Sequence, residues 1–385
     1  MNMYKEKTLA DKIQQCTRCV MSNEVDVLIR FDEHGVCHHC HRYDELLATR
    51  VFSGMEADRR LADLTEKIKK SRKSNSQYDC LIGVSGGVDS TYVAYLVKQL
   101  GLRPLAVHFD NGWNSELAVN NIEKVLRKLD IDLVTYVVDW KEFRDLQLSF
   151  LKASVPDGEI PTDHAIFALL WETAAKHKIK YIISGMNFAT ESISVPNWSY
   201  GHSDWKYIKD VHRVHGSVPL KSYPHFGFIK LFYYNFIRGI RNVSVLNYVD
   251  YNKERVMRTL QDELGWVYYG GKHYESIYTR FFQGYILPSK FNIDKRYGHC
   301  SDLINARQLS REEALEELSV NSYSEDMKEA DLAYAAKKFS LTVEQFREIL
   351  ARPPSSYGSY KNSARFVARL KTFVNFLRGV GLYPK

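Results

Sequence analysis

The sequence predicts an α/β chain: a parallel sheet with flanking helices, preceded by a small cysteine-rich module and followed by a mostly helical region. Short apolar segments alternate with helical ones from Tyr78 onward, as in βαβ units. Two Cys-x-x-Cys pairs lie close to the start of the chain. From about Ser301 the pattern is helical again, and Ser310-Arg311-Glu312-Glu313 is typical of a capping box.

The two cysteine pairs predict a closed metal site. Cys16 and Cys19 are separated by seventeen residues from Cys37 and Cys40, a spacing typical of four thiolates around one structural zinc ion. We expect residues 1–50 to form a zinc ribbon, in which Val25 to Phe31 and the turn at His34-Gly35 make a short hairpin. A redox Cys-x-x-Cys pair is the alternative reading.

The remaining chain divides by composition. Residues 51–76 read as a charged helical linker, within one helical pattern from Asp44 to Ser74. We expect the sheet domain over 77–265, with an aromatic-rich insertion near 195–250 that shows no periodicity. Within this domain we expect further strands at 105–109, 133–138 and 181–184, and helices at 114–129 and 163–177. Residues 266–385 read as a cationic lobe and a helical region.

Composition is that of an ordinary globular protein, with 45% hydrophobic and 26% charged residues and a formal net charge of +7 over 385 residues. The mild positive charge is compatible with phosphate-rich ligands, and equally with a basic surface that has no nucleic-acid role. No apolar run reaches membrane-spanning length, and the charged N-terminus does not resemble a signal peptide. With clustered cysteines, these features predict a cytoplasmic protein.

The first expected strand, from Asp79, runs into Ser85-Gly86-Gly87-Val88-Asp89-Ser90 and then a helix. Paired glycines let main-chain N–H groups converge, and a helix N-terminus carries a positive dipole end, so this turn predicts a phosphate cradle. The Walker pattern is absent. An ordinary Gly-rich strand-to-helix turn is the alternative.

The turn resembles the PP-loop of ATP pyrophosphatases, which include NAD synthetase, GMP synthetase and asparagine synthetase. The resemblance implies an adenine nucleotide alpha hydrolase-like fold and cleavage of ATP between its α and β phosphates. It implies that Ser85, Gly86, Gly87 and Ser90 cradle the phosphates and that Asp89 binds magnesium.

Ligands of parallel sheets bind at the carboxyl ends of the strands, where further candidates follow. Asp110 follows the second strand and is expected to contact ATP, and Gly185 follows the fourth. The segment from Ser184 resembles one in NAD synthetases that ends in a metal-binding Glu, which implies that Glu191 shares the magnesium ion with Asp89. A helix N-terminal carboxylate is the alternative for Glu191.

Cations that stabilise a departing pyrophosphate are expected in the lobe after residue 266. Lys272 follows two glycines and is the first candidate catalytic cation; Arg296 is the second, and Lys290 is expected to contact the phosphates. For any one lysine, an ordinary surface position is the alternative.

Together these segments resemble the N-acetyl sugar amidotransferases of bacterial surface-polysaccharide and lipopolysaccharide (LPS) O-antigen biosynthesis. The matching segments are CTRC at 16–19, SGGVDS at 85–90, HFDNGW at 108–113, SGMNFATES at 184–192, KHYES at 272–276 and LPSKFNIDKR at 287–296. The resemblance implies a nucleotide-linked N-acetyl sugar as substrate, ATP, Mg²⁺ and Zn²⁺ as cofactors, and conversion of the acetamido group to an acetamidino group. It also implies ammonia supplied by partners that resemble the glutaminase and cyclase subunits of imidazole glycerol phosphate synthase.

Two other functions stay open. A tRNA-modifying PP-loop enzyme is the main alternative, although nucleic acid is the less expected partner, and a non-catalytic zinc-ribbon adaptor is the third reading. Aromatic residues in the insertion are candidates for stacking on a sugar or uracil ring, with core packing as the alternative. They are Trp198, Tyr200, Trp205 and Tyr207.

Overall fold

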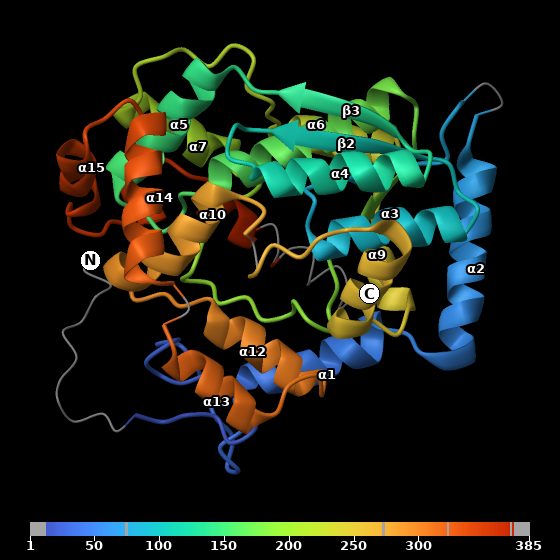
Figure 1. The fold of residues 1–385 in the computed structure, drawn as a ribbon, viewed down its shortest axis with the longest axis horizontal. Helices are drawn as coiled ribbons and strands as arrows, with labels where there is room; N and C mark the ends of the chain where they lie inside the picture. Colours follow the sequence, from blue (N-terminus) through green and yellow to red (C-terminus); the bar gives the residue numbers. More distant parts are fainter. Residues whose placement is uncertain (1–12, 74–75, 272–273, 322, 370–371, 373–385) are drawn as a thin grey trace.

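The computed structural model describes residues 13–73, 76–271, 274–321, 323–369 and 372. Its centre is a five-stranded, all-parallel sheet with strand order β3-β2-β1-β4-β5 (Figure 1). The strands are β1 Cys80–Gly83, β2 Pro104–Asp110, β3 Asp132–Val137, β4 Tyr181–Ser184 and β5 Arg241–Ser244. The α/β fold predicted from the sequence is confirmed.

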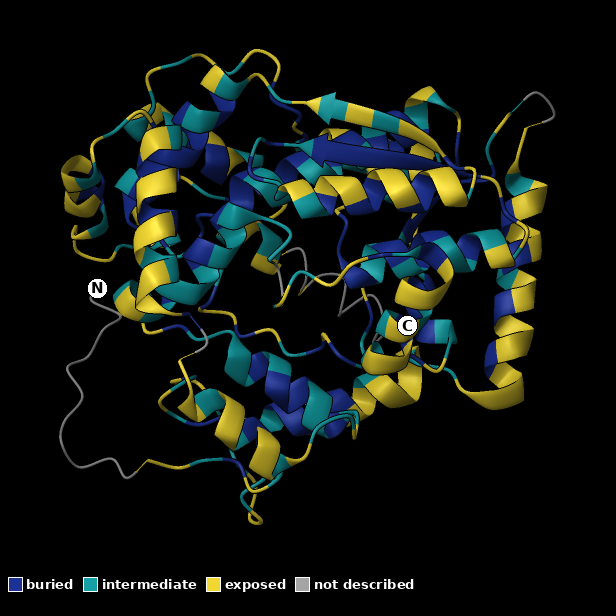
Figure 2. Ribbon diagram, in the orientation of Figure 1, coloured by how far each residue is buried: buried dark blue, intermediate teal, exposed yellow. Residues whose placement is uncertain are grey.

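Helices cover both faces of the sheet because successive side chains of a strand point to opposite faces. In β1, Ile82 packs in a cluster with helices α2, α3, α4 and α9, whereas Leu81 packs with α5, α6 and α7. These helices are α2 Gly54–Ser71, α3 Val88–Gln99, α4 Glu116–Lys128, α5 Trp140–Ala153, α6 Ile160–Lys176, α7 Trp205–His215 and α9 Lys253–Leu264. Figure 2 shows β2 buried and β3 partly exposed at the sheet edge.

The C-terminal region is helical, as expected. Its elements are α10 Ile277–Phe281, the π-helix η3 Phe282–Ile286, α11 Leu287–Phe291, α12 Arg296–Asn305, α13 Arg311–Ser319, α14 Glu325–Lys338, α15 Val343–Leu350 and the short 3-10 helix η4 Tyr357–Ser359. Ser310 forms the expected capping box with Glu313 at the start of α13. No helix of the described residues is long and apolar enough to cross a bilayer.

Two local expectations were only partly right. The expected turn at His34-Gly35 is present, with an antiparallel bridge between Phe31 and Cys37 across it. Residues 25–30 form turns and no strand, because Asp26 accepts a turn-type hydrogen bond from the Leu28 N–H. The helical pattern from Asp44 breaks into α1 His38–Arg50 and α2, with residues 51–53 extended between them.

The insertion at 195–250 is more ordered than expected. It contains α7, α8 Phe228–Phe232, the π-helix η1 Tyr233–Ile237, strand β5 and the 3-10 helix η2 Val245–Tyr248. Strand β5 has the sequence Arg-Asn-Val-Ser, half exposed at the sheet edge, so it lacks the apolar run that marks β1, β2 and β4.

Candidate active site

The segment from Ser85 to Ser90, here called the SGGVDS loop, joins β1 to α3 and forms its own hydrogen-bond network. The Ser90 hydroxyl accepts a bond from the Ser85 N–H at 3.2 Å and donates to the Gly87 carbonyl at 3.2 Å. The Ser85 hydroxyl accepts from the Gly87 N–H at 3.3 Å. The two serines therefore fix the curvature of the loop.

Position 86 requires a glycine, because of its backbone φ angle and because there is no room for a side chain. Its φ is +82°, and a Cβ at this position would lie 2.6 Å from the Ala118 carbonyl oxygen. The Trp266 indole donates to the Gly86 carbonyl at 2.9 Å and holds the loop from the side of α9. Any side chain at this position would force the loop away from α4.

The loop lies at the point where the order of the strands reverses. β1 and β4 are neighbours in the sheet, so the SGGVDS loop and the segment after Ser184 leave the same edge side by side. A Cβ on Gly185 would lie 3.2 to 3.3 Å from Asp89 and Ser90 atoms. Open α/β sheets bind ligands at such a reversal, so this edge is the expected ligand site.

The two proposed magnesium ligands face the same phenol. The Tyr251 hydroxyl donates to Asp89 Oδ1. Burial, followed by the negative charges of Asp89 and then Glu191, raises the pKa of Tyr251 above its usual range. The exposed Glu191 also lines a large cavity in front of the loop. Carboxylate oxygens are the ligands that Mg²⁺ prefers, so Asp89 and Glu191 are of the type that could hold this ion.

A cavity of about 460 Å³, here called the smaller cavity, opens beside the loop at the ends of β1, β2 and β4. Ser85, Ser90 and Gly185 line it on the sheet side, and Glu275 and Ser276 line it from the segment before α10. The Ser115 N–H donates to the Glu275 carbonyl at 2.8 Å, which fixes this segment over the sheet edge.

A second cavity of about 1170 Å³, here called the larger cavity, lies between the sheet edge and the C-terminal helices. Glu191 and Trp198 line it on one side, and Arg280 and Arg296 line it on the other. The two arginines are held in place: Arg280 pairs with Asp331 at 2.5 Å, and Arg296 pairs with Asp294 at 2.8 Å. Phosphate groups and aromatic-stacking rings both fit such a lining.

Lys295 and Gln283 line both cavities and mark their junction. Both side chains bind Glu159, Lys295 at 3.0 Å and Gln283 at 2.9 Å. Lys295 was not among the predicted site residues, although it lies in the LPSKFNIDKR segment, because its position relative to Lys290 depends on the shape of η3 and α11. It is the cation best placed to contact a ligand that spans the two cavities.

The structure does not bring two predicted residues to the site. Lys290 donates to the Ile349 carbonyl of α15 at 3.5 Å and lines neither cavity; burial lowers its pKa to about 8. Asp110 accepts a bond from the Gly112 N–H at 2.9 Å and stabilises a turn, while its neighbours Phe109 and Asn111 line the smaller cavity. Neither side chain lines one of the two cavities, and the phosphate contacts expected of Lys290 and Asp110 stay predictions.

Lys272 lies outside the described residues. The described residues nearest to it on either side, Gly271 and Tyr274, line the larger cavity. The role of Lys272 stays a prediction.

Of the four aromatic candidates, only Trp198 lines the larger cavity. Tyr207 is fully buried and donates to Asp157 at 2.7 Å, Tyr200 stacks on Tyr357, and Trp205 stacks on His225. For these three, core packing is the observed role.

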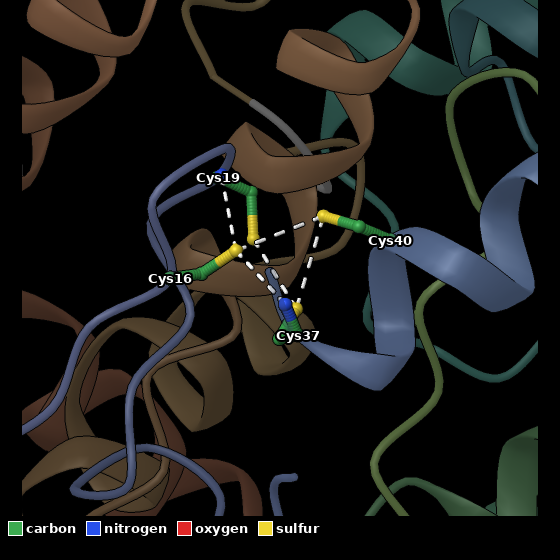
Figure 3. A group of neighbouring side chains, drawn as sticks. All are labelled: Cys16, Cys19, Cys37 and Cys40. Carbon is green, nitrogen blue, oxygen red and sulfur yellow. Dashed lines mark hydrogen bonds between the residues drawn. The ribbon is translucent and has the colours of Figure 1, made fainter. Parts of the chain in front are cut away.

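The four cysteines converge as the spacing predicts (Figure 3). All four are buried, and the Cys16–Cys40, Cys19–Cys37 and Cys37–Cys40 sulfur atoms are 3.9, 3.7 and 3.8 Å apart. Thiolates about 2.3 Å from a tetrahedral zinc ion have S–S edges of roughly 3.8 Å, so the cluster has the size of a zinc site. Backbone N–H groups of Arg18, Cys19 and Cys37 point at the Cys16 sulfur.

The cysteine module contacts both walls of the larger cavity. On one side the Tyr43 hydroxyl donates to the Ala189 carbonyl at 3.2 Å, two residues before Glu191. On the other, Arg311 donates to the Cys19 carbonyl at 3.3 Å and the Val20 N–H donates to the Ser301 hydroxyl at 3.3 Å. The module therefore connects the sheet edge to α12 and α13, although it contributes no residue to the lining of either cavity.

Two family models match the chain, one over the strands that carry the SGGVDS loop and one over the C-terminal helices that line the larger cavity. Residues 79–188 match the model for the queuosine biosynthesis protein QueC, and residues 275–373 match the C-terminal domain model for WbpG-like LPS biosynthesis proteins. The first match begins at β1 and ends just after β4, and the fold around the SGGVDS loop is therefore that of a PP-loop ATP pyrophosphatase domain. The second match agrees with the sequence resemblance to proteins of LPS biosynthesis, over the C-terminal helical region.

Curated relatives share shorter segments. An uncharacterized protein of Methanocaldococcus jannaschii is 24% identical over 51% of this chain and 64% of its own length. GMP synthase of Thermosipho africanus is 38% identical over 23% of this chain and 17% of its own length. The tRNA(Ile)-lysidine synthase of Chlamydia pneumoniae is 34% identical over 18% of this chain and 22% of its own length. The chain thus spans less than two thirds of each of these relatives.

Among solved structures, the NH3-dependent NAD synthetase of Campylobacter jejuni, in complex with the nitrate ion, is 17% identical with a TM-score of 0.28, covering 37% of this chain and 62% of that chain. A predicted tRNA methyltransferase subunit of Methanocaldococcus jannaschii is 13% identical with a TM-score of 0.28. The match covers 46% of this chain and 74% of that chain.

Proposed function

We propose that this protein is an ATP-dependent amidotransferase that acts on a nucleotide-linked N-acetyl sugar. In this reaction the acetamido oxygen attacks the α-phosphorus of ATP and pyrophosphate leaves. Ammonia then attacks the resulting imidate carbon, and AMP leaves with the former acetamido oxygen. The product carries an acetamidino group. The observation that carries this proposal is the junction of two cavities at Lys295 and Gln283, one beside the PP-loop and one walled by the WbpG-like domain.

The smaller cavity is assigned to the adenosine and α-phosphate of ATP. The SGGVDS loop presents N–H groups and two hydroxyls, and α3 begins at Val88 with its N-terminus toward the loop, an arrangement that favours phosphate oxygens. Asp89 and Glu191 would hold Mg²⁺, which supplies charge neutralisation to the departing pyrophosphate.

The larger cavity is assigned to the nucleotide sugar. Arg280 and Arg296 are already oriented by carboxylates and present planar cations suited to a diphosphate, and Trp198 offers an aromatic face. A sugar held there would place its acetamido group toward Lys295, where the two cavities meet. Lys295 would then stabilise negative charge as the oxygen attacks the α-phosphorus.

Ammonia is proposed to come from separate glutaminase and cyclase-like subunits. A neutral amine must reach the imidate before water does, and most free ammonia is protonated near neutral pH, so a sealed path from a partner favours the reaction. This part of the proposal predicts that the chain alone uses concentrated ammonium and not glutamine. Addition of the partner subunits should make glutamine a substrate.

The decisive experiment incubates the chain with ATP, Mg²⁺, ammonium and a panel of UDP-linked N-acetyl sugars. We expect AMP and pyrophosphate to form only with an acceptor sugar, and mass spectrometry to find oxygen replaced by NH in that sugar. The Asp89→Asn variant is the matched control. AMP formation with tRNA and with none of the sugars would overturn the proposal in favour of a tRNA-modifying enzyme.

A further inference from the structure

An exposed apolar surface lies on the segment formed by α8 and η1. It consists of Phe228, Ile229, Phe232, Tyr233, Phe236 and Ile237, here called the apolar ridge. Ile229 is 88% exposed, Ile237 67% and Phe236 64%. Positions 229, 232, 233 and 236 recur at helical spacing and therefore share one face. Contiguous apolar patches of this kind are uncommon on monomeric proteins and mark interaction sites.

The opposite face of the same segment is anchored to the protein. Tyr234 is buried, and the Asn235 side chain accepts a hydrogen bond from the Trp171 indole of α6 at 2.8 Å. Phe232 and Phe236 stack on each other at 4.7 Å between ring centroids. The segment that carries the ridge is thus held against the rest of the protein, and the apolar side chains of the ridge point outward.

A cationic cavity of about 200 Å³ adjoins the ridge and shares Ile237 with it. Its charged lining consists of Lys73, Lys178, Lys180 and Arg238, and no acidic side chain lines it among the described residues. Lys180 and Arg238 are oriented by carbonyls, Lys180 by that of Arg238 and Arg238 by that of Ala175. Within the described chain no salt bridge neutralises these four cations.

The ridge and the cationic cavity lie at the amino edge of the sheet. Lys178 and Lys180 come immediately before β4, and Arg238 lies just before β5, its parallel neighbour. The SGGVDS loop and the segment after Ser184 leave the opposite, carboxyl edge. A partner bound at the amino edge would leave both site cavities accessible.

We propose that this surface docks the protein on an anionic lipid bilayer, with the ridge in the interfacial region and a lipid phosphate in the cationic cavity. Exposed aromatic and aliphatic side chains beside clustered lysines are the pattern of interfacial membrane elements. Lysine is depleted in protein–protein interfaces, so three lysines beside the ridge favour a lipid surface over a protein partner. This inference concerns a different face from the active site and does not depend on the proposed reaction.

Vesicle sedimentation with the full chain tests the proposal. We expect binding to vesicles of phosphatidylcholine with phosphatidylglycerol, release by high salt, and little binding to phosphatidylcholine alone. Ile229→Ser with Phe236→Ser should weaken binding roughly tenfold or more, because the apolar insertion is lost. Lys73→Glu with Lys178→Glu should weaken binding to anionic vesicles by a similar factor.

Matched controls change the same chemistry elsewhere. Met55→Ser with Val137→Ser removes two exposed apolar side chains, and Lys128→Glu with Lys337→Glu reverses two exposed charges; neither pair should alter binding. Thermal melts monitored by circular dichroism check that every variant folds. Absence of binding, equal binding to neutral vesicles, or equal loss in the control variants would overturn the proposal. A dimer in sedimentation velocity that only the ridge variant abolishes, without vesicle binding, would also overturn it and identify a second copy as the occupant.

Discussion

The sheet wall and the helical wall of the candidate active site are built by different means. On the sheet side, the SGGVDS loop and the segment after Ser184 follow directly from strands β1 and β4. On the helical side, Arg280, Lys295 and Arg296 are positioned by ion pairs with Asp331, Glu159 and Asp294. Local motifs thus determine the first wall, whereas contacts between distant segments position two of the three cations of the second.

Lys290 and Lys295 show this difference within one short segment. They are five positions apart, yet Lys290 contacts α15 and Lys295 contacts Glu159 at the junction of the cavities. The π-helix η3, the short helix α11 and the left-handed residue Asn292, with φ +55°, set the register between them. Sequence composition cannot distinguish two such lysines.

The largest effect is expected on the sheet wall, from Asp89→Asn. If this carboxylate holds Mg²⁺, AMP formation should fall roughly a hundredfold or more, while the thermal melt stays near that of the wild type. Rates measured over a range of magnesium concentrations check this. Asp110→Asn is the control, since Asp110 accepts a turn hydrogen bond outside both cavities, and a normal rate for Asp89→Asn would exclude the metal role.

On the helical wall, Lys295→Met should lower the rate of pyrophosphate release about ten- to a hundredfold, because the cation at the junction is lost. Lys290→Met is the matched control and should change this rate little. Stopped-flow pyrophosphate release and binding of the nucleotide sugar are measured for both variants. Equal losses in the two variants would show that the charge of the segment matters and its placement does not.

A third prediction concerns the cysteine module that spans both walls. Cys37→Ser should remove zinc from the purified protein and lower its melting temperature, because the small module has little apolar core of its own. We expect a smaller loss of rate, roughly tenfold, since no cysteine lines a cavity. Elemental analysis and calorimetry provide the measurement. Cys80→Ala, in the buried strand β1, is the cysteine control and should keep the metal.

The smallest effect is expected from Lys290, as a pH dependence of stability. Burial lowers the pKa of Lys290 to about 8, below its unfolded value, so the unfolded chain binds more protons between these two values. The contribution of Lys290 to stability should therefore rise as pH increases from about 8 to 10. Denaturant unfolding of wild type and Lys290→Met across this range checks the sign. Parallel pH profiles for the two proteins would contradict it.

Residues whose neighbours are close in sequence were the predictable ones. The two cysteine pairs each span four residues and lie close together in the sequence, and the SGGVDS loop is one continuous segment. The structure brings the residues of each set together. Glu159 could not be selected, because its partners Gln283 and Lys295 lie 124 and 136 positions away. Strand β5 was missed because an edge strand of four half-exposed residues needs no apolar run.

The cysteine module bonds to the residue two before Glu191 on one side and to helices α12 and α13 on the other. A metal ion bound by the four cysteines would hold the two walls together as a structural ion and take no part in the reaction. The supply of that ion would then limit the fraction of protein molecules that form a closed cavity. Under the proposed function, scarcity of zinc in the cell would lower sugar modification through the yield of folded protein, with the turnover of each intact molecule unchanged.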